Sequence, residues 1–142
     1  QVEDAKARGG RVLVGGSTHS EMAHAFQPTL IVDAPHDALI HQEETFGPVA
    51  SLIPFDTEAE AISLANATEY GLVAYVVTRD GARMMRLSRA LEFGMVAINR
   101  VKITGGPIPF GGWKQSGIGR EGSRHGLEAF TELKYLCIDT AA

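Results

Sequence analysis

The sequence predicts an α/β fold built from parallel βαβ units. Between Val49 and Asn99, three apolar runs alternate with two segments that carry helix signals. The runs are nearly continuous in apolar residues, which is typical of parallel strands buried on both faces. Connections between such strands are right-handed in almost all proteins. A chain of 142 residues is also long enough to bury a core of its own.

The residues before Val49 predict a helix and a small antiparallel pair of strands. Residues 1–8 have neither an initiator Met nor a signal-peptide pattern, so we expect this start to be a cut inside a helix, which Gly9 and Gly10 end. Residues 11–14, between glycine pairs, predict a short strand that ends in a turn. Residues 29–32 are a β-branched run flanked by Pro28 and Pro35, which favours a strand near a sheet edge. We expect these two strands to pair, with residues 17–27 as a loop between them.

Two helices are predicted between the later strands, which should cover residues 49–55, 72–78 and 95–99. Thr57 and Glu60 match a capping box, and that helix should end near Thr68. Asp80 is placed to cap a second helix, whose apolar stripe is Met84, Leu87 and Leu91.

A glycine-rich loop over residues 105–122 is the first place to look for a site, because long unpatterned loops in compact domains are usually functional. Gly117, Gly119 and Gly122 match the spacing of a dinucleotide-binding turn. However, no apolar strand precedes them and no acidic residue follows about 20 positions later. The alternative is that these glycines allow positive φ angles and close backbone passage. A short helix over 123–130 and a strand over 132–138 should follow.

Composition excludes several classes of function. The net charge of −4 and the scattered basic residues argue against nucleic acid, and no apolar run reaches the ~20 residues of a membrane span. The single cysteine, Cys137, excludes an internal disulfide and favours a reducing compartment, so we expect a cytoplasmic protein. The histidines lack metal-ligand spacing and are interpreted as surface residues without a metal: His19, His24, His36, His41 and His125.

Four further segments stand out in the sequence: residues 43–49 (EETFGPV), 66–72 (NATEYGL), Asn99 after the strand 94–98, and 110–121 (FGGWKQSGIGRE). In this order they resemble landmarks of the aldehyde dehydrogenase superfamily. The stretch from Gly119 to Ile138 is similar in particular to succinate-semialdehyde dehydrogenases. The resemblance implies the C-terminal portion of the catalytic domain over residues 1–131, followed by a terminal oligomerisation strand and tail over 132–142.

The activity that this resemblance implies is the NAD- or NADP-dependent oxidation of a semialdehyde, most readily succinate semialdehyde, through a cysteine thioester. In the family, the nucleophilic cysteine, the general base and the oxyanion-hole Asn lie upstream of Gln1, so this chain alone should be inactive. Cys137 falls in an alternating terminal strand, where a thiol is usually a small buried apolar group.

The resemblance also assigns roles to five residues. Glu44 would accept hydrogen bonds from the nicotinamide ribose, and Phe46 would pack near the nicotinamide. Phe110 would form a wall of the substrate pocket, Thr104 would hold the substrate carboxylate where the branch usually has Ser, and Glu121 would orient or relay protons. The structural alternatives are a solvated carboxylate for Glu44, a core aromatic for Phe46 and a first-turn helix acid for Glu121.

The resemblance further implies a dimer or tetramer, with Glu132 as an interface carboxylate of the terminal strand. A non-catalytic assembly or binding module of the same fold is the alternative function. Retention of Glu44, Phe46, Phe110 and Glu121 favours the enzyme, since a scaffold has no physical need for them.

Overall fold

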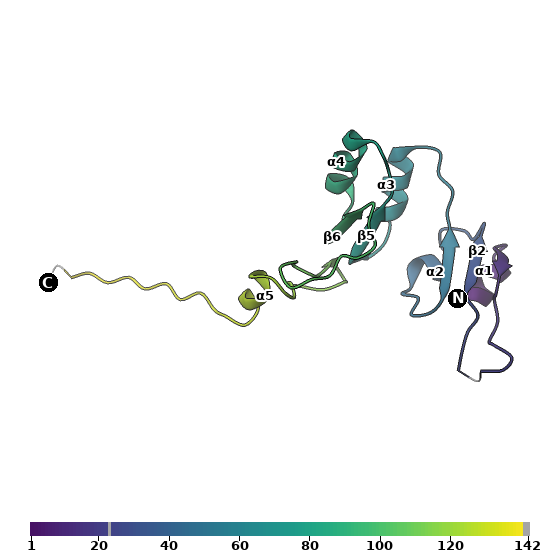
Figure 1. The fold of residues 1–142 in the computed structure, drawn as a ribbon, viewed down its shortest axis with the longest axis horizontal. Helices are drawn as coiled ribbons and strands as arrows, with labels where there is room; N and C mark the ends of the chain where they lie inside the picture. Colours follow the sequence, from purple (N-terminus) through teal and green to yellow (C-terminus); the bar gives the residue numbers. More distant parts are fainter. Residues whose placement is uncertain (23, 141–142) are drawn as a thin grey trace. The chain divides into compact units, whose positions relative to one another are not determined.

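The computed structural model describes residues 1–22 and 24–140, which form two compact units, Gln1–Ala61 and Ile62–Ala142 (Figure 1). Helix α3, Glu58–Asn66, begins in the first unit and continues into the second. Its start has the predicted capping box, because Thr57 Oγ1 accepts the N–H of Glu60 at 3.1 Å. The Glu60 carboxylate reaches back to the N–H of Asp56 at 2.8 Å.

The first unit is a three-stranded sheet with two short helices. Its elements are α1 (Val2–Ala7), β1 (Arg11–Val14), β2 (Thr29–Val32), α2 (Leu39–Gln42) and β3 (Val49–Leu52). The strand order is β1-β2-β3, with β1 antiparallel to β2 as predicted and β2 parallel to β3. Val2 and Ala5 of α1 pack with the fully buried Ile31 of β2 to form the core.

The second unit contains the predicted βαβ motif. Its elements are β4 (Tyr70–Gly71), β5 (Val73–Val76), α4 (Gly81–Ala90), β6 (Met95–Ile98), β7 (Trp113–Lys114) and α5 (His125–Glu128). Strands β5 and β6 are parallel, with Val73 opposite Met95, and α4 connects them. β4 pairs antiparallel with β7, which lies inside the glycine-rich loop, and sequence periodicity did not predict this contact.

Asp80 caps α4 as predicted. Its Oδ1 accepts the N–H groups of Ala82 at 2.8 Å and Arg83 at 3.1 Å. These bonds, led by that of Arg83, hold the pKa of the Asp80 carboxyl below its usual range. The stripe faces inward, because Met84 and Leu87 are half-buried and Leu91 is 6% exposed.

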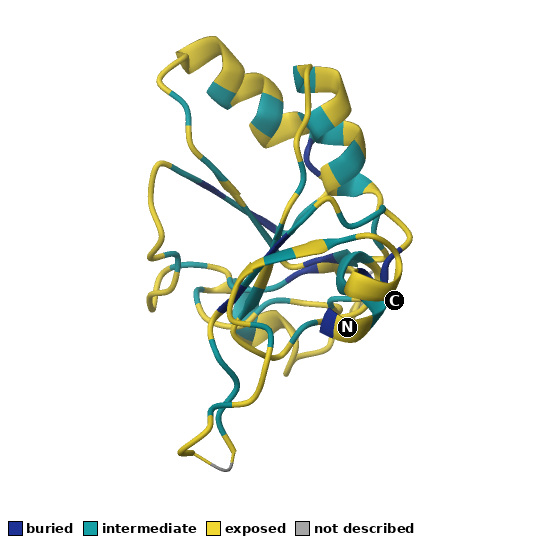
Figure 2. Ribbon diagram, turned by 90° about the vertical axis from the view of Figure 1, so that its right-hand side faces the viewer, coloured by how far each residue is buried: buried dark blue, intermediate teal, exposed yellow. Residues whose placement is uncertain are grey.

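Three expectations about the strands were wrong. β3 pairs with β2, so it does not extend the β5–β6 sheet. The strands are not buried on both faces, since Leu52 of β3 and Tyr75 of β5 are exposed; Figure 2 shows how few residues are buried. β2, expected near a sheet edge, is the central strand of its sheet. Residues 131–140 of the single chain have no regular secondary structure, because a strand needs a hydrogen-bonded neighbour and no described segment provides one. The strand expected to pair with another subunit stays a prediction.

Candidate active-site segments and family membership

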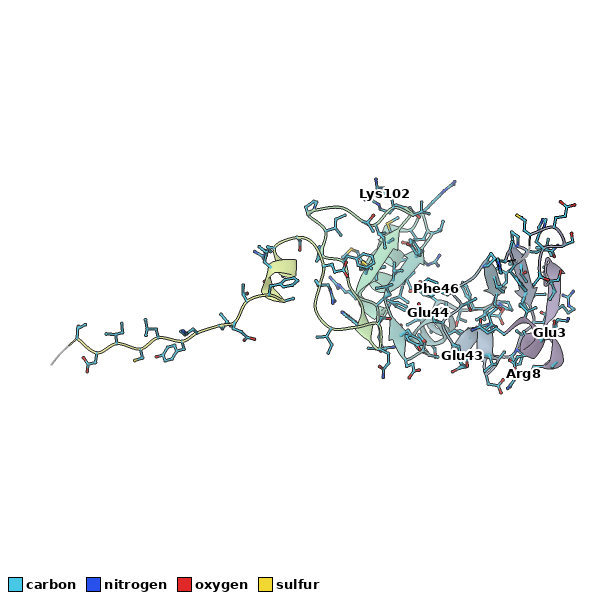
Figure 3. The ribbon with its side chains drawn as sticks, turned by 90° about the horizontal axis from the view of Figure 1, so that it is seen from below. Glu3, Arg8, Glu43, Glu44, Phe46 and Lys102 are labelled. Carbon is cyan, nitrogen blue, oxygen red and sulfur yellow. The ribbon has the colours of Figure 1, made fainter. Side chains whose placement is uncertain are left out.

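Glu44 and Phe46 lie on the segment between α2 and β3 in the first unit. They line one cavity of about 600 Å³, called here the Glu44 cavity, whose walls include Gln1, Glu3, His24, Thr45 and Val49. Phe46 is 97% exposed, so the expectation of a core aromatic does not hold. Glu44 is also exposed, and its carboxylate has no hydrogen-bond donor within the described part of the chain. Figure 3 shows both side chains.

Phe110 and Glu121 are brought together at the ends of the glycine-rich segment. The N–H of Phe110 donates to the carbonyl of Glu121 at 2.9 Å, and the N–H of Glu121 donates back at 2.7 Å. Both residues line a cavity of about 530 Å³, called here the Phe110 cavity, with Leu72, Ile118, Leu127 and Phe130 among its apolar walls. The two predicted side chains therefore share one pocket of the second unit.

Glu121 is not an acid of the first helical turn. Helix α5 begins at His125, with Arg124 as its N-cap, and the N–H of His125 donates to Ser123 Oγ at 3.2 Å. The Glu121 backbone is instead paired with Phe110. The alternative interpretation of Glu121, as an acid in the first turn of a helix, is therefore wrong.

Gly117, Gly119 and Gly122 have φ angles of 124°, 81° and 66°. No strand–turn–helix surrounds them, since β7 is two residues long and α5 only four. The three glycines therefore serve the positive φ angles of the loop and do not form a dinucleotide-binding turn. Close passage occurs nearby, because a Cβ on Gly94 would lie 2.2 Å from the carbonyl oxygen of Gly111.

Lys114 fastens this loop to the ends of two other elements. Its ammonium donates to the carbonyls of Asn66 at 3.0 Å and Thr68 at 3.1 Å, and it pairs with the Glu92 carboxylate at 2.7 Å. Asn66 is the last residue of α3, Thr68 lies two residues beyond it, and Glu92 follows α4. The segment from Phe110 to Glu121 is therefore tied to the framework of its unit between its two paired ends.

Thr104 lies in the irregular segment between Asn99 and Pro109 and is exposed. It does not line the Phe110 cavity, and a separate cavity of about 280 Å³ is lined by its neighbours Ile103 and Ile108. The structure therefore brings Phe110 and Glu121 together but leaves Thr104 outside their pocket.

The model of the aldehyde dehydrogenase family matches residues 1–136. The chain belongs to this family. It is 49% identical to the succinate-semialdehyde dehydrogenase [NADP(+)] of Escherichia coli (strain K12) and 47% identical to the glutarate-semialdehyde dehydrogenase of Pseudomonas aeruginosa. Each match covers 96% of this chain and 28% of the relative, so the chain spans a little over a quarter of their length.

Solved structures agree with this assignment. A crystal structure of an NADP-dependent enzyme of E. coli has a TM-score of 0.93 at 49% identity, over 96% of this chain and 28% of that chain. The Mycobacterium tuberculosis aldehyde dehydrogenase complexed with NAD+ has a TM-score of 0.90 at 36% identity, over 99% and 29%. The fold is therefore that of an aldehyde dehydrogenase segment.

Cys137 of this aldehyde dehydrogenase chain is exposed, so the expectation of a buried thiol was wrong. The reason is the one given for residues 131–140: with no strand beside it, nothing covers the side chain. Leu133 and Tyr135, predicted to share its face, are exposed as well.

The histidines form no metal site: in residues 1–22 and 24–140, no three His, Cys, Asp or Glu side chains gather around a possible ion. His41 differs from the surface histidine that was predicted, because it is half-buried. Its Nδ1 lies 3.0 Å from the Pro35 carbonyl and its Nε2 lies 2.9 Å from Ser51 Oγ, so it links α2 to β3.

No helix in the described ranges has both the length and the apolar composition needed to cross a bilayer.

Proposed function

We propose that this chain forms part of the active site of an NAD(P)-dependent aldehyde dehydrogenase that oxidises a carboxylate-bearing semialdehyde to the acid. Succinate semialdehyde is the substrate favoured, with glutarate semialdehyde the next to test. The observation that carries this proposal is 49% identity, over 96% of the chain, to an enzyme described as a succinate-semialdehyde dehydrogenase.

The residues of the Glu44 cavity fit one end of a nicotinamide cofactor. A carboxylate with two open acceptor oxygens suits a pair of ribose hydroxyls. The exposed ring of Phe46 offers an apolar face in the same cavity. When bound, the cofactor would accept a hydride from the substrate. Both NAD and NADP are candidates, since the chain resembles one enzyme named with NADP(+) and another solved with NAD+.

The second unit would contribute the substrate side. Phe110 would exclude water from the aldehyde end with its half-buried ring. Glu121 would hold or pass a proton from its exposed carboxylate, at the position fixed by its pairing with Phe110. Thr104 Oγ1 would donate a hydrogen bond to the substrate carboxylate, although its place outside the Phe110 cavity gives that role no geometric support here.

The thioester chemistry would need a cysteine other than Cys137, since this thiol lies in the exposed segment 131–140 and lines neither cavity. We therefore propose that the nucleophile comes from a segment upstream of this chain, and that residues 132–142 form the strand and tail through which copies of the enzyme associate as a dimer or tetramer. The cytoplasmic location stays a prediction from the sequence.

The proposal is tested by comparing this chain with the longer protein that includes the upstream segment. Reduced-cofactor absorbance is followed with succinate and glutarate semialdehyde, using NAD and NADP in turn. We expect turnover by the longer protein and none by residues 1–142 alone. Sustained cofactor-dependent turnover by the chain alone would overturn the assignment of the nucleophile, and a longer protein that is inactive on every aldehyde would favour the non-catalytic module.

A further inference from the structure

Side chains from the region of helix α1 contact the segment that carries Glu44. After α2 ends at Gln42, the chain has no helix or strand until β3 begins at Val49. Backbone hydrogen bonds to regular structure hold only the ends of residues 43–48: the N–H of Glu43 donates to the carbonyl of Leu39 at 2.8 Å, and the carbonyl of Pro48 accepts the N–H of Thr29 at 2.8 Å. Two side chains of the α1 region contact the stretch that runs from Leu39 to Thr45, one near each end.

Asp4 holds the beginning of this stretch. Its Oδ2 accepts the N–H of Leu39, the first residue of α2, at 2.9 Å, and its Oδ1 accepts Nε of Arg8 at 2.8 Å. The bond from Leu39 and then that from Arg8 hold the pKa of the Asp4 carboxyl below its usual range. The carboxylate is therefore ionised at neutral pH, and it satisfies one of the N–H groups that a helix start leaves without a partner.

Gln1 holds the end of the same stretch. Its Oε1 accepts the hydroxyl of Thr45 at 2.5 Å, and its Nε2 donates to the carbonyl of Glu44 at 3.3 Å. Gln1 also lines the Glu44 cavity. The amide therefore contacts the backbone of Glu44 and the side chain of the next residue, while the Glu44 carboxylate stays open to the cavity.

We propose that Asp4 and Gln1 are positioning residues that hold the Glu44 carboxylate in place for the cofactor. This inference rests on the proposed role of Glu44. Asp4 fixes where α2 starts, and Gln1 fixes where the chain leaves it. Between these two points the backbone of Glu44 is held, so the cofactor would meet a carboxylate that projects from a fixed place on the cavity wall.

The experiment uses the longer enzyme that contains this chain and compares Asp4→Ala, Asp4→Asn and Gln1→Ala with Glu44→Gln. Arg11→Gln is the matched control, because it removes an ion pair of 2.8 Å to Asp33 in the same unit without touching residues 39–45. Cofactor dissociation constants, single-turnover hydride-transfer rates, aldehyde KM and melting temperature are measured for each.

We expect Asp4→Ala and Gln1→Ala each to weaken cofactor binding by about fivefold, the size expected for one net hydrogen bond, and to slow hydride transfer while aldehyde KM is unchanged. Asp4→Asn should recover part of the affinity, because its amide oxygen can still accept the N–H of Leu39. Arg11→Gln should leave cofactor binding at the wild-type value.

A double variant separates a positioning role from a general loss of structure. If Asp4 acts through Glu44, then Asp4→Ala combined with Glu44→Gln should bind cofactor no more weakly than Glu44→Gln alone. Additive losses would overturn the inference, and so would Asp4 and Gln1 variants that match Arg11→Gln. If Asp4→Ala does not fold, Gln1→Ala and Asp4→Asn decide. Should Glu44→Gln itself change neither affinity nor rate, the proposed role of Glu44 fails instead.

Discussion

Asn99 is the residue whose replacement should most directly loosen the βαβ motif. It follows β6 with a φ of 54°, in the left-handed region. Its Nδ2 donates to the carbonyl of Thr78 at 2.8 Å, and its Oδ1 accepts the N–H of Thr78 at 3.0 Å. One side chain therefore satisfies both backbone groups of Thr78, which lies two residues beyond the end of β5, and it clamps the carboxyl ends of the two parallel strands together.

The cost of Asn99→Ala can be worked out from these contacts. Two neutral hydrogen bonds contribute about 1 kcal/mol each, and the value is lower here because water can reach the exposed site. A left-handed Ala adds roughly 1 kcal/mol, because Ala lacks the short polar side chain that makes this φ tolerable for Asn. The sum is about 2 kcal/mol for local opening of the strand ends. Asn99→Gly should cost roughly 1 kcal/mol less, since glycine adopts this φ freely.

Hydrogen exchange reports this opening at the amide of Thr78. A loss of about 2 kcal/mol corresponds to roughly thirtyfold faster exchange in Asn99→Ala, with a smaller acceleration in Asn99→Gly. Asn99→Asp is the matched control, because it keeps the acceptor for the N–H of Thr78 and loses only the donor. Equal exchange in the Ala and Gly variants would refute the conformational part of this reasoning, and wild-type exchange in all three would refute the clamp.

Three further outcomes are expected. Asp80→Ala should lower the melting temperature at neutral pH but have little effect in strong acid. The pKa of the Asp80 carboxyl is lowered in the folded protein, so the carboxylate stabilises the fold above its unfolded pKa and loses this contribution as the pH falls through its folded pKa. Thermal melts across pH 2–7 check this. In the longer enzyme, Glu44→Gln should slow hydride transfer in single-turnover assays, because an amide accepts ribose hydroxyls less strongly. Glu132→Lys there should loosen a dimer or tetramer, as sedimentation would show, whereas a monomeric wild type would contradict the interface role.

Local signals were the part of the fold that the sequence predicted well. Asp80 and Thr57 cap helices because N-cap hydrogen bonds join residues only two or three positions apart. The β1–β2 pair and the parallel β5–β6 pair followed from apolar runs and their connections. The short helix α2 was missed, since four residues carry too little periodicity to distinguish a helix from a loop.

Long-range pairing could not be read in the same way. The link between Phe110 and Glu121 joins two backbones across a loop that has no periodic pattern, and it uses no side chain that could have served as a signal. The strand predicted around Tyr135 has the right alternation of side chains but no neighbouring strand in this chain. Alternation indicates which side chains would share a face of the strand, but it does not show which other strand would pair with it. Family landmarks supplied Glu44 and Phe46, whose exposed loop positions have no physical signature of their own.

The contacts of the Lys114 ammonium affect how fast this lysine can be labelled chemically. Its three hydrogens have three oxygens to bind, those of Asn66, Thr68 and Glu92. An amine-reactive reagent must reach the nitrogen itself, and these three oxygens surround that nitrogen while the contacts hold. Lys102 and Lys134 are exposed and have no such set of oxygens. The rate at which Lys114 is labelled, relative to those two, therefore measures how often the glycine-rich loop detaches from the ends of α3 and α4.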